Sequence, residues 1–257
     1  MINNPPYPLF EKISIEINSY CNRSCTFCTR TKDDREKVRM PEELVHKVLY
    51  ELAAIKYNGL IAFHFFNEVF TDNRIFSFFE KCKELELNNY LVTNGDFLKK
   101  HIVERLKTYN IKEFALSIYD WKTEEEFQAK CNYFQKELKL SDHDWEFYII
   151  KGGENFGNRA GYVNHREENL ILPLTAGCSK IENKIDVRYD GSVVMCCLDY
   201  YAIHKIGDIN RDNIIDIWYG DIRQKQISDL RKGLRKNYKL CSKCSDYIVE
   251  INYSQAQ

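Results

Sequence analysis

The first group of cysteines in this chain has the spacing C-x3-C-x2-C and comprises Cys21, Cys25 and Cys28. Three thiolates can ligate three irons of a [4Fe–4S] cube, whereas complete ligation by protein takes four cysteines. The fourth iron is then open to a ligand or a substrate, as one position of a catalytic zinc site is. A structural zinc site would need a fourth ligand close by, and the nearest histidine is His46. The spacing therefore favours a reactive iron–sulfur site.

The second group contains four cysteines: Cys178, Cys196, Cys241 and Cys244. Four thiolates saturate either a [4Fe–4S] cluster or a tetrahedral zinc ion, and their spacing alone leaves both open. Cys197 follows a member of this group directly. We expect the pair to lie on a strand, where neighbouring side chains point to opposite faces and cannot comfortably ligate one cluster.

Strands and helices alternate along the first part of the chain. Predicted strands at 12–18, 60–66, 90–93, 114–118 and 145–150 are separated by predicted helices at 41–57, 74–85, 98–108 and 123–138. Such alternation predicts an α/β fold with a parallel sheet covered by helices. Functional residues are then expected where the strands end, which is where the first cysteine group and the stretches 66–68, 93–95 and 117–120 fall.

The pattern changes near residue 152. A glycine-rich stretch runs to about 173, and Asp190-Gly191 predicts a tight turn between strands at 185–189 and 192–196. Helices are predicted at 213–220 and 221–232. We therefore expect two domains, residues 1–170 and a smaller cysteine-bearing unit at 171–257.

The composition excludes some classes of partner. The net charge is -1 and the pI is about 6.6, so no overall basic field favours nucleic acid or an anionic membrane. The longest apolar stretch, 60–66, is far too short to span a bilayer. The first residues have neither a basic nor an apolar segment of a signal peptide, and a cytoplasmic location is the expectation.

The first cysteine group, with an aromatic residue before its last cysteine and a strand before it, resembles the signature of radical S-adenosylmethionine (SAM) enzymes. The resemblance implies a partial (β/α)6 TIM-like barrel in which the open iron binds SAM and a 5′-deoxyadenosyl radical abstracts hydrogen from a substrate. It also implies that Phe27 packs near the adenine and that Glu68 binds the methionine amine. Asn94 and Ser117 match further positions that contact the cofactor.

The second cysteine group and its hairpin resemble the Twitch domain, a shortened SPASM domain. This resemblance implies one auxiliary [4Fe–4S] cluster, and hence two clusters in all. Arg159, in Asn158-Arg159-Ala160-Gly161, is similar to an arginine that follows the fifth strand in such relatives and is expected either to hold substrate oxygens or to be a solvated loop residue. Cys197 is expected to be either a small buried side chain or a hydrogen-atom donor, as in related epimerases.

Three functions remain open. The extra thiol favours epimerisation at a carbon beside a hydroxyl or amine, with Cys197 as the donor. The first alternative is dehydrogenation of a small carbohydrate or cyclitol alcohol, with the auxiliary cluster as electron acceptor. The second is a non-catalytic redox-sensing iron–sulfur protein. The expected partners are a small carbohydrate, a cyclitol or a short peptide, and an electron donor such as flavodoxin or ferredoxin. His64 is predicted to be a core histidine.

Overall fold

The computed structural model describes residues 7–32, 35–152, 157–163 and 175–245. Their strands form one eight-stranded sheet in the order β5-β4-β3-β2-β1-β6-β7-β8. Neighbouring strands from β5 to β6 pair in parallel, and the pairs β6–β7 and β7–β8 are antiparallel. The strands are β1 (Lys12–Ile15), β2 (Leu60–Ala62), β3 (Asn88–Thr93), β4 (Ile111–Ile118), β5 (Glu146–Lys151), β6 (Lys184–Val187), β7 (Ser192–Val194) and β8 (Lys205–Asp208).

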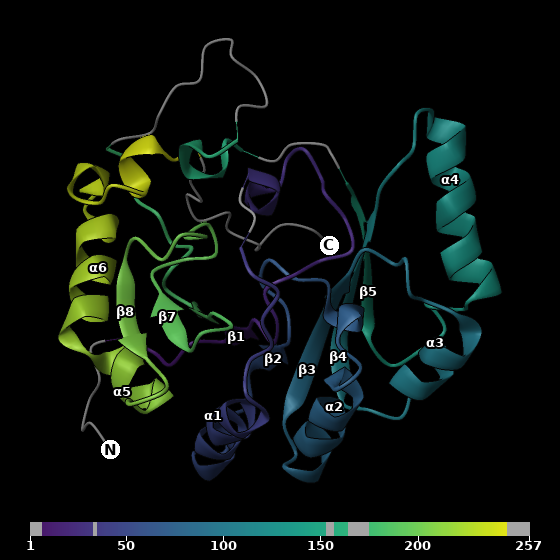
Figure 1. The fold of residues 1–257 in the computed structure, drawn as a ribbon, viewed down its shortest axis with the longest axis horizontal. Helices are drawn as coiled ribbons and strands as arrows, with labels where there is room; N and C mark the ends of the chain where they lie inside the picture. Colours follow the sequence, from purple (N-terminus) through teal and green to yellow (C-terminus); the bar gives the residue numbers. More distant parts are fainter. Residues whose placement is uncertain (1–6, 33–34, 153–156, 164–174, 246–257) are drawn as a thin grey trace, which may run out of the picture.

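Helices lie along the outer side of the curved sheet (Figure 1). They are α1 (Glu42–Ala54), α2 (Ile75–Glu84), α3 (Lys100–Leu106), α4 (Glu124–Asn132), α5 (Ile214–Tyr219) and α6 (Asp221–Arg231). The predicted helix 123–138 changes to a π-helical turn at Tyr133–Glu137. The α/β class with its parallel sheet is therefore confirmed.

The two faces of the sheet differ in polarity. On β1, Ile13 and Ile15 are fully buried in the core shared with the helices, and successive side chains of a strand point to opposite faces. Ser14 is therefore on the opposite face, as are Lys184 and Asp186 of β6, because Ser14 is in register with Asp186. The sheet thus has an apolar face against the helices and a polar face on its inner side.

The boundary predicted at residues 170 and 171 lies outside the described residues. The sheet itself continues from β1 directly into β6, with Lys12 opposite Lys184 and Ile15 opposite Val187. The predicted hairpin is confirmed by the antiparallel pairing of β6 with β7. Gly191 in its turn has φ +86°, a conformation that favours glycine.

Two predicted strands are shorter than expected. The strand predicted over 60–66 ends at Ala62, so His64 lies just beyond it. The strand predicted over 192–196 ends at Val194. Cys196 and Cys197 therefore lie in the turn after β7, and the premise that strand alternation separates them is wrong.

Candidate active site

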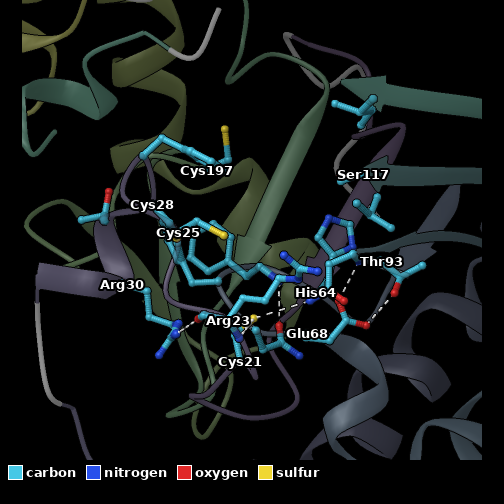
Figure 2. Close-up of a pocket in the computed structure, with 18 of the residues that line it drawn as sticks. Cys21, Arg23, Cys25, Cys28, Arg30, His64, Glu68, Thr93, Ser117 and Cys197 are labelled. Atoms are coloured by element: carbon cyan, nitrogen blue, oxygen red, sulfur yellow. Dashed lines mark hydrogen bonds between the residues drawn. The ribbon is translucent and has the colours of Figure 1, made fainter. Parts of the chain in front are cut away.

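A cavity of about 300 Å³ opens where the parallel strands end. Figure 2 shows side chains from distant parts of the chain that point toward it. The cavity brings together all three cysteines of the first group and every cofactor or substrate residue expected from the sequence: Cys21, Cys25, Cys28, Phe27, Glu68, Asn94, Ser117, Arg159 and Cys197.

The three cysteines of the first group are neighbours on one wall of the cavity. Burial raises the pKa of Cys21, and burial together with the other two thiols raises the pKa of Cys25 to about 11. Iron ligation needs thiolates, so metal binding would have to offset the burial of Cys21 and Cys25. No set of three His, Cys, Asp or Glu side chains in the described part of the chain is gathered around a single ion position. The three thiols nevertheless come from one loop and line one cavity, which is the donor set that a four-iron cube with one open iron needs.

Arg23 fastens the cysteine loop to two neighbouring strand ends. Its Nε donates to Asp96 Oδ2 at 2.6 Å, and its Nη1 donates to Asp120 Oδ2 at 2.5 Å. Asp96 follows β3 and Asp120 follows β4, so one guanidinium joins three loops with the paired geometry that carboxylates favour. Sequence reasoning missed this residue because its partners are distant in the chain.

Glu68 organises the turn after β3. It is 3% exposed and accepts hydrogen bonds from Thr93 Oγ1 at 2.7 Å and from the backbone N–H of Asn94 at 2.9 Å. Burial raises its pKa against the opposing effect of these bonds, and a bound ammonium would favour the ionised form. Asn94 Nδ2 in turn lies 3.9 Å from Cys21 Sγ, so the turn also reaches the cysteine loop.

An aromatic pair forms another wall of the cavity. The rings of Phe27 and Tyr119 stack with centroids 5.6 Å apart and an interplanar angle of 21°. Ser117 at the end of β4 is 6% exposed and lines the same cavity. The ring of Tyr119 lies against the backbone of Gly152. A side chain at that position would clash with the ring, because a Cβ there would lie 2.2 Å from Cδ1 of Tyr119. A flat face beside the cluster loop suits an aromatic base such as adenine.

Arg159 reaches the cavity from a loop that is tied to the second cysteine group. Its Nε donates to the carbonyl of Phe27 at 3.4 Å. The preceding Asn158 donates from Nδ2 to the carbonyl of Lys243 at 2.7 Å and accepts from the N–H of Ser245 at 2.9 Å. These bonds place the arginine between the two cysteine groups.

The second cysteine group lies next to Cys197, which lines this cavity. Cys178, Cys196 and Cys241 pack in one small cluster, and Cys196 also packs with Cys244 in the next. Burial raises the pKa of Cys196, and it raises the pKa of Cys241 to about 12. Buried thiols gathered in this way fit a fully ligated cluster. Cys197 packs in the same cluster as Cys196 and Cys244, but unlike the four cysteines of the second group it also lines the cavity.

The cavity also contains residues that sequence analysis misjudged. His64 is not simply a core histidine, because its ring packs against Tyr90 at a centroid distance of 5.2 Å and also lines the cavity. Burial and the nearby Lys184 lower its pKa to about 3, so the imidazole is neutral. Lys184 itself was not singled out, and the signal that could have found it is the alternation of Lys184 and Asp186 with the apolar Ile185 and Val187.

Two parts of the chain match known families. Residues 15–150 match the Radical SAM superfamily, and residues 178–245 match SPASM, an iron–sulfur cluster-binding domain. The chain is 25% identical over 245 residues to the S-adenosyl-L-methionine-dependent 2-deoxy-scyllo-inosamine dehydrogenase of Niallia circulans. The alignment covers 94% of this chain and 95% of that protein.

Solved structures agree with these matches. The crystal structure of BtrN in complex with AdoMet and 2-DOIA has a TM-score of 0.80 at 25% identity, over 93% of this chain and 94% of that chain. AdoMet-bound native anSMEcpe, at 16% identity and a TM-score of 0.57 over 92% of this chain and 89% of that chain, shares the fold. The family match spans more than half of the 257 residues, and the cavity contains the three cysteines that such chemistry requires. The chain therefore belongs to the radical SAM superfamily and is an enzyme that uses SAM and a [4Fe–4S] cluster, with a SPASM-type iron–sulfur domain in residues 178–245.

Proposed function

We propose that the protein oxidises a hydroxyl-bearing carbon of a small polyol, such as a cyclitol or a carbohydrate, to a carbonyl. The observation that carries this proposal is the cavity, which is lined by the three cysteines of the first group and by Cys197, a residue that packs with Cys196 and Cys244 of the second group. Support comes from the relative that is a dehydrogenase of 2-deoxy-scyllo-inosamine. The likeness favours dehydrogenation over the epimerisation that the extra thiol suggests.

The proposal assigns roles to the residues around the cavity. Cys21, Cys25 and Cys28 hold the cluster that binds SAM, and Cys178, Cys196, Cys241 and Cys244 hold one auxiliary cluster. When bound, these groups supply the radical that removes a hydrogen atom and the acceptor for the electron that the substrate loses. Phe27 packs on the adenine, and the carboxylate of Glu68 faces the methionine amine. Asn94 and Ser117 complete the cofactor site.

The substrate is held on the remaining side of the cavity. Arg159 donates to substrate oxygens, because a guanidinium offers several donors in a fixed plane. The proposed division into a barrel, residues 1–170, and an auxiliary domain, residues 171–257, puts this arginine near the C-terminal end of the barrel. An electron donor such as flavodoxin or ferredoxin would reduce the first cluster.

None of the helices in the described residues is long and apolar enough to cross a membrane.

The first test is the iron content after anaerobic reconstitution. Two clusters predict about eight irons in the wild type and about four in a Cys21→Ala/Cys25→Ala/Cys28→Ala variant. About four irons in the wild type and none in the variant would rule out the auxiliary cluster and the electron acceptor with it.

The second test identifies the reaction. Reduced enzyme with SAM should form 5′-deoxyadenosine and convert a cyclitol to a product that lacks two hydrogens. Epimerisation is the second candidate, favoured by the Cys197 thiol in the cavity. An unoxidised isomer that gains one deuterium in heavy water, and that Cys197→Ser no longer forms, would establish epimerisation instead. A reduced protein that never cleaves SAM would exclude both reactions.

A further inference from the structure

The wall of the cavity away from the first cysteine group is built by the polar face of the sheet. Lys184, the first residue of β6, lines the cavity together with His64 and Cys197. Close to it on the same face, Ser14 Oγ and Tyr90 Oη lie 3.3 Å apart. Because Lys184 comes from a strand rather than a loop, its backbone position is fixed by the sheet, which suits it to substrate recognition.

Lys184 carries a positive charge into this cavity. Its Nζ lies 3.2 Å from Asp186 Oδ1, and Asp186 is 2% exposed and does not line the cavity. Burial acts to lower the pKa of Lys184, but the carboxylate of Asp186 outweighs it and the pKa is raised. An ammonium has three donors, so it can bind a ligand from the cavity side while the carboxylate holds it from behind.

The other charges that line the cavity leave an ammonium without a partner. Among the lining residues that the structure describes, Glu68 is the one carboxylate, and the proposed function already uses it for the methionine amine, whereas Arg23, Arg30 and Arg159 are further cations. His64, beside Lys184, is neutral. An amine placed near Lys184 would meet a like charge, whereas an anion would gain a charge-assisted hydrogen bond.

We infer that the substrate carries an anionic group, a carboxylate or a phosphate, and that Lys184 binds it. This inference rests on the proposed function, which makes the molecule in this cavity a small polyol, and it specifies the class of that polyol. It also separates this chain from the dehydrogenase relative, whose substrate is an inosamine and therefore contains an amine. Lys184 acts here as a binding and positioning residue.

The test measures the binding of four sugars that differ in one group. Glucose, glucosamine, glucuronate and glucose 6-phosphate are dialysed against the anaerobically reconstituted protein loaded with SAM. One or both anionic sugars should bind at least about tenfold more tightly than glucose, which is the scale of one hydrogen bond to a charged group. Glucosamine should bind no better than glucose. A preference for only one of the anions identifies the group as a carboxylate or a phosphate.

Variants connect the preference to the lysine. Lys184→Gln should remove it, and Lys184→Arg should keep most of it. The double variant Lys184→Gln/Asp186→Asn should also lack the preference without leaving a buried carboxylate unpaired. Lys12→Gln is the matched control, because Lys12 is in register with Lys184 and pairs with Glu113 at 2.6 Å but does not line the cavity. That variant should bind the anionic sugars as the wild type does.

Three results would overturn the inference: anionic sugars that bind no better than glucose, including no binding of any sugar; tightest binding of glucosamine; or an anion preference that survives Lys184→Gln. Formation of 5′-deoxyadenosine is measured separately. A protein that selects anions through Lys184 but never cleaves SAM would refute the proposed reaction and leave this recognition site standing.

Discussion

The histidine in the cavity should make the stability of the protein depend on pH. The pKa of His64 is lowered to about 3, by burial first and by the neighbouring charge of Lys184 second. In the unfolded chain a histidine has its ordinary pKa of about 6.5. On acidification the unfolded chain therefore takes up this proton first. The contribution of His64 to stability is complete above pH ~6.5 and is lost as the pH falls toward about 3.

The size of the effect follows from the two pKa values. Between about pH 7 and about pH 5.5, the folded protein keeps His64 neutral while the unfolded chain becomes mostly protonated there. The linkage relation then predicts a loss of about 1.3 kcal/mol in the free energy of unfolding from this one residue. The wild type should lose this amount in addition to the contributions of all other groups.

The assay compares the wild type with His64→Gln. Urea unfolding of both proteins, reconstituted and kept anaerobic, gives the free energy of unfolding at each pH. Subtracting the change in the variant from the change in the wild type cancels the contributions of the clusters and of other titrating groups. The wild type should lose about 1.3 kcal/mol more than the variant. Equal losses in the two proteins would refute the claim that His64 stays neutral in the cavity.

Two further predictions concern the walls of the cavity. Gly152→Ala should cost about 1–3 kcal/mol and displace Tyr119, because the new Cβ would lie 2.2 Å from its ring. Gly177→Ala is the control, since its Cβ would come no closer than 3.5 Å to any neighbour. Thermal unfolding of both variants measures whether only Gly152→Ala is destabilised. Arg23→Ala should cost only about 1–2 kcal/mol, because Asp96 is partly exposed, yet lower the iron retained after gel filtration. Arg23→Lys should lie between it and the wild type, and full iron retention by Arg23→Ala would contradict a clamping role.

The chemistry of the site was predictable because it depends on local sequence. Cys21, Cys25 and Cys28 are three closely spaced thiols, which can ligate three of the four irons of a cluster. A strand directly before them places them at one edge of a parallel sheet. The same rule of strand ends brought Glu68 and Ser117 into the cavity. Each of these predictions needed only the type of a residue and its position after a strand.

The lengths of the strands were less predictable. Cys196 and Cys197 were expected to continue β7, but that strand ends at Val194. Both thiols pack with the buried Cys244, and Cys197 in addition lines the cavity. Where a strand ends depends on whether its neighbours continue to pair with it, and that is not visible in a short run of apolar residues.

By itself, the sequence determined the kind of chemistry: the number and spacing of the thiols, the alternation of strands and helices, and the resemblance to radical SAM enzymes. Only the tertiary structure decided which other side chains line the cavity. Lys184 enters the cavity because β6 pairs in parallel with β1, with Lys184 opposite Lys12. A shift of that register by one residue would turn Ile185 toward the cavity and Lys184 toward the core. Pairing between strands so far apart in the chain is set by the packing of the whole sheet, which no local pattern encodes.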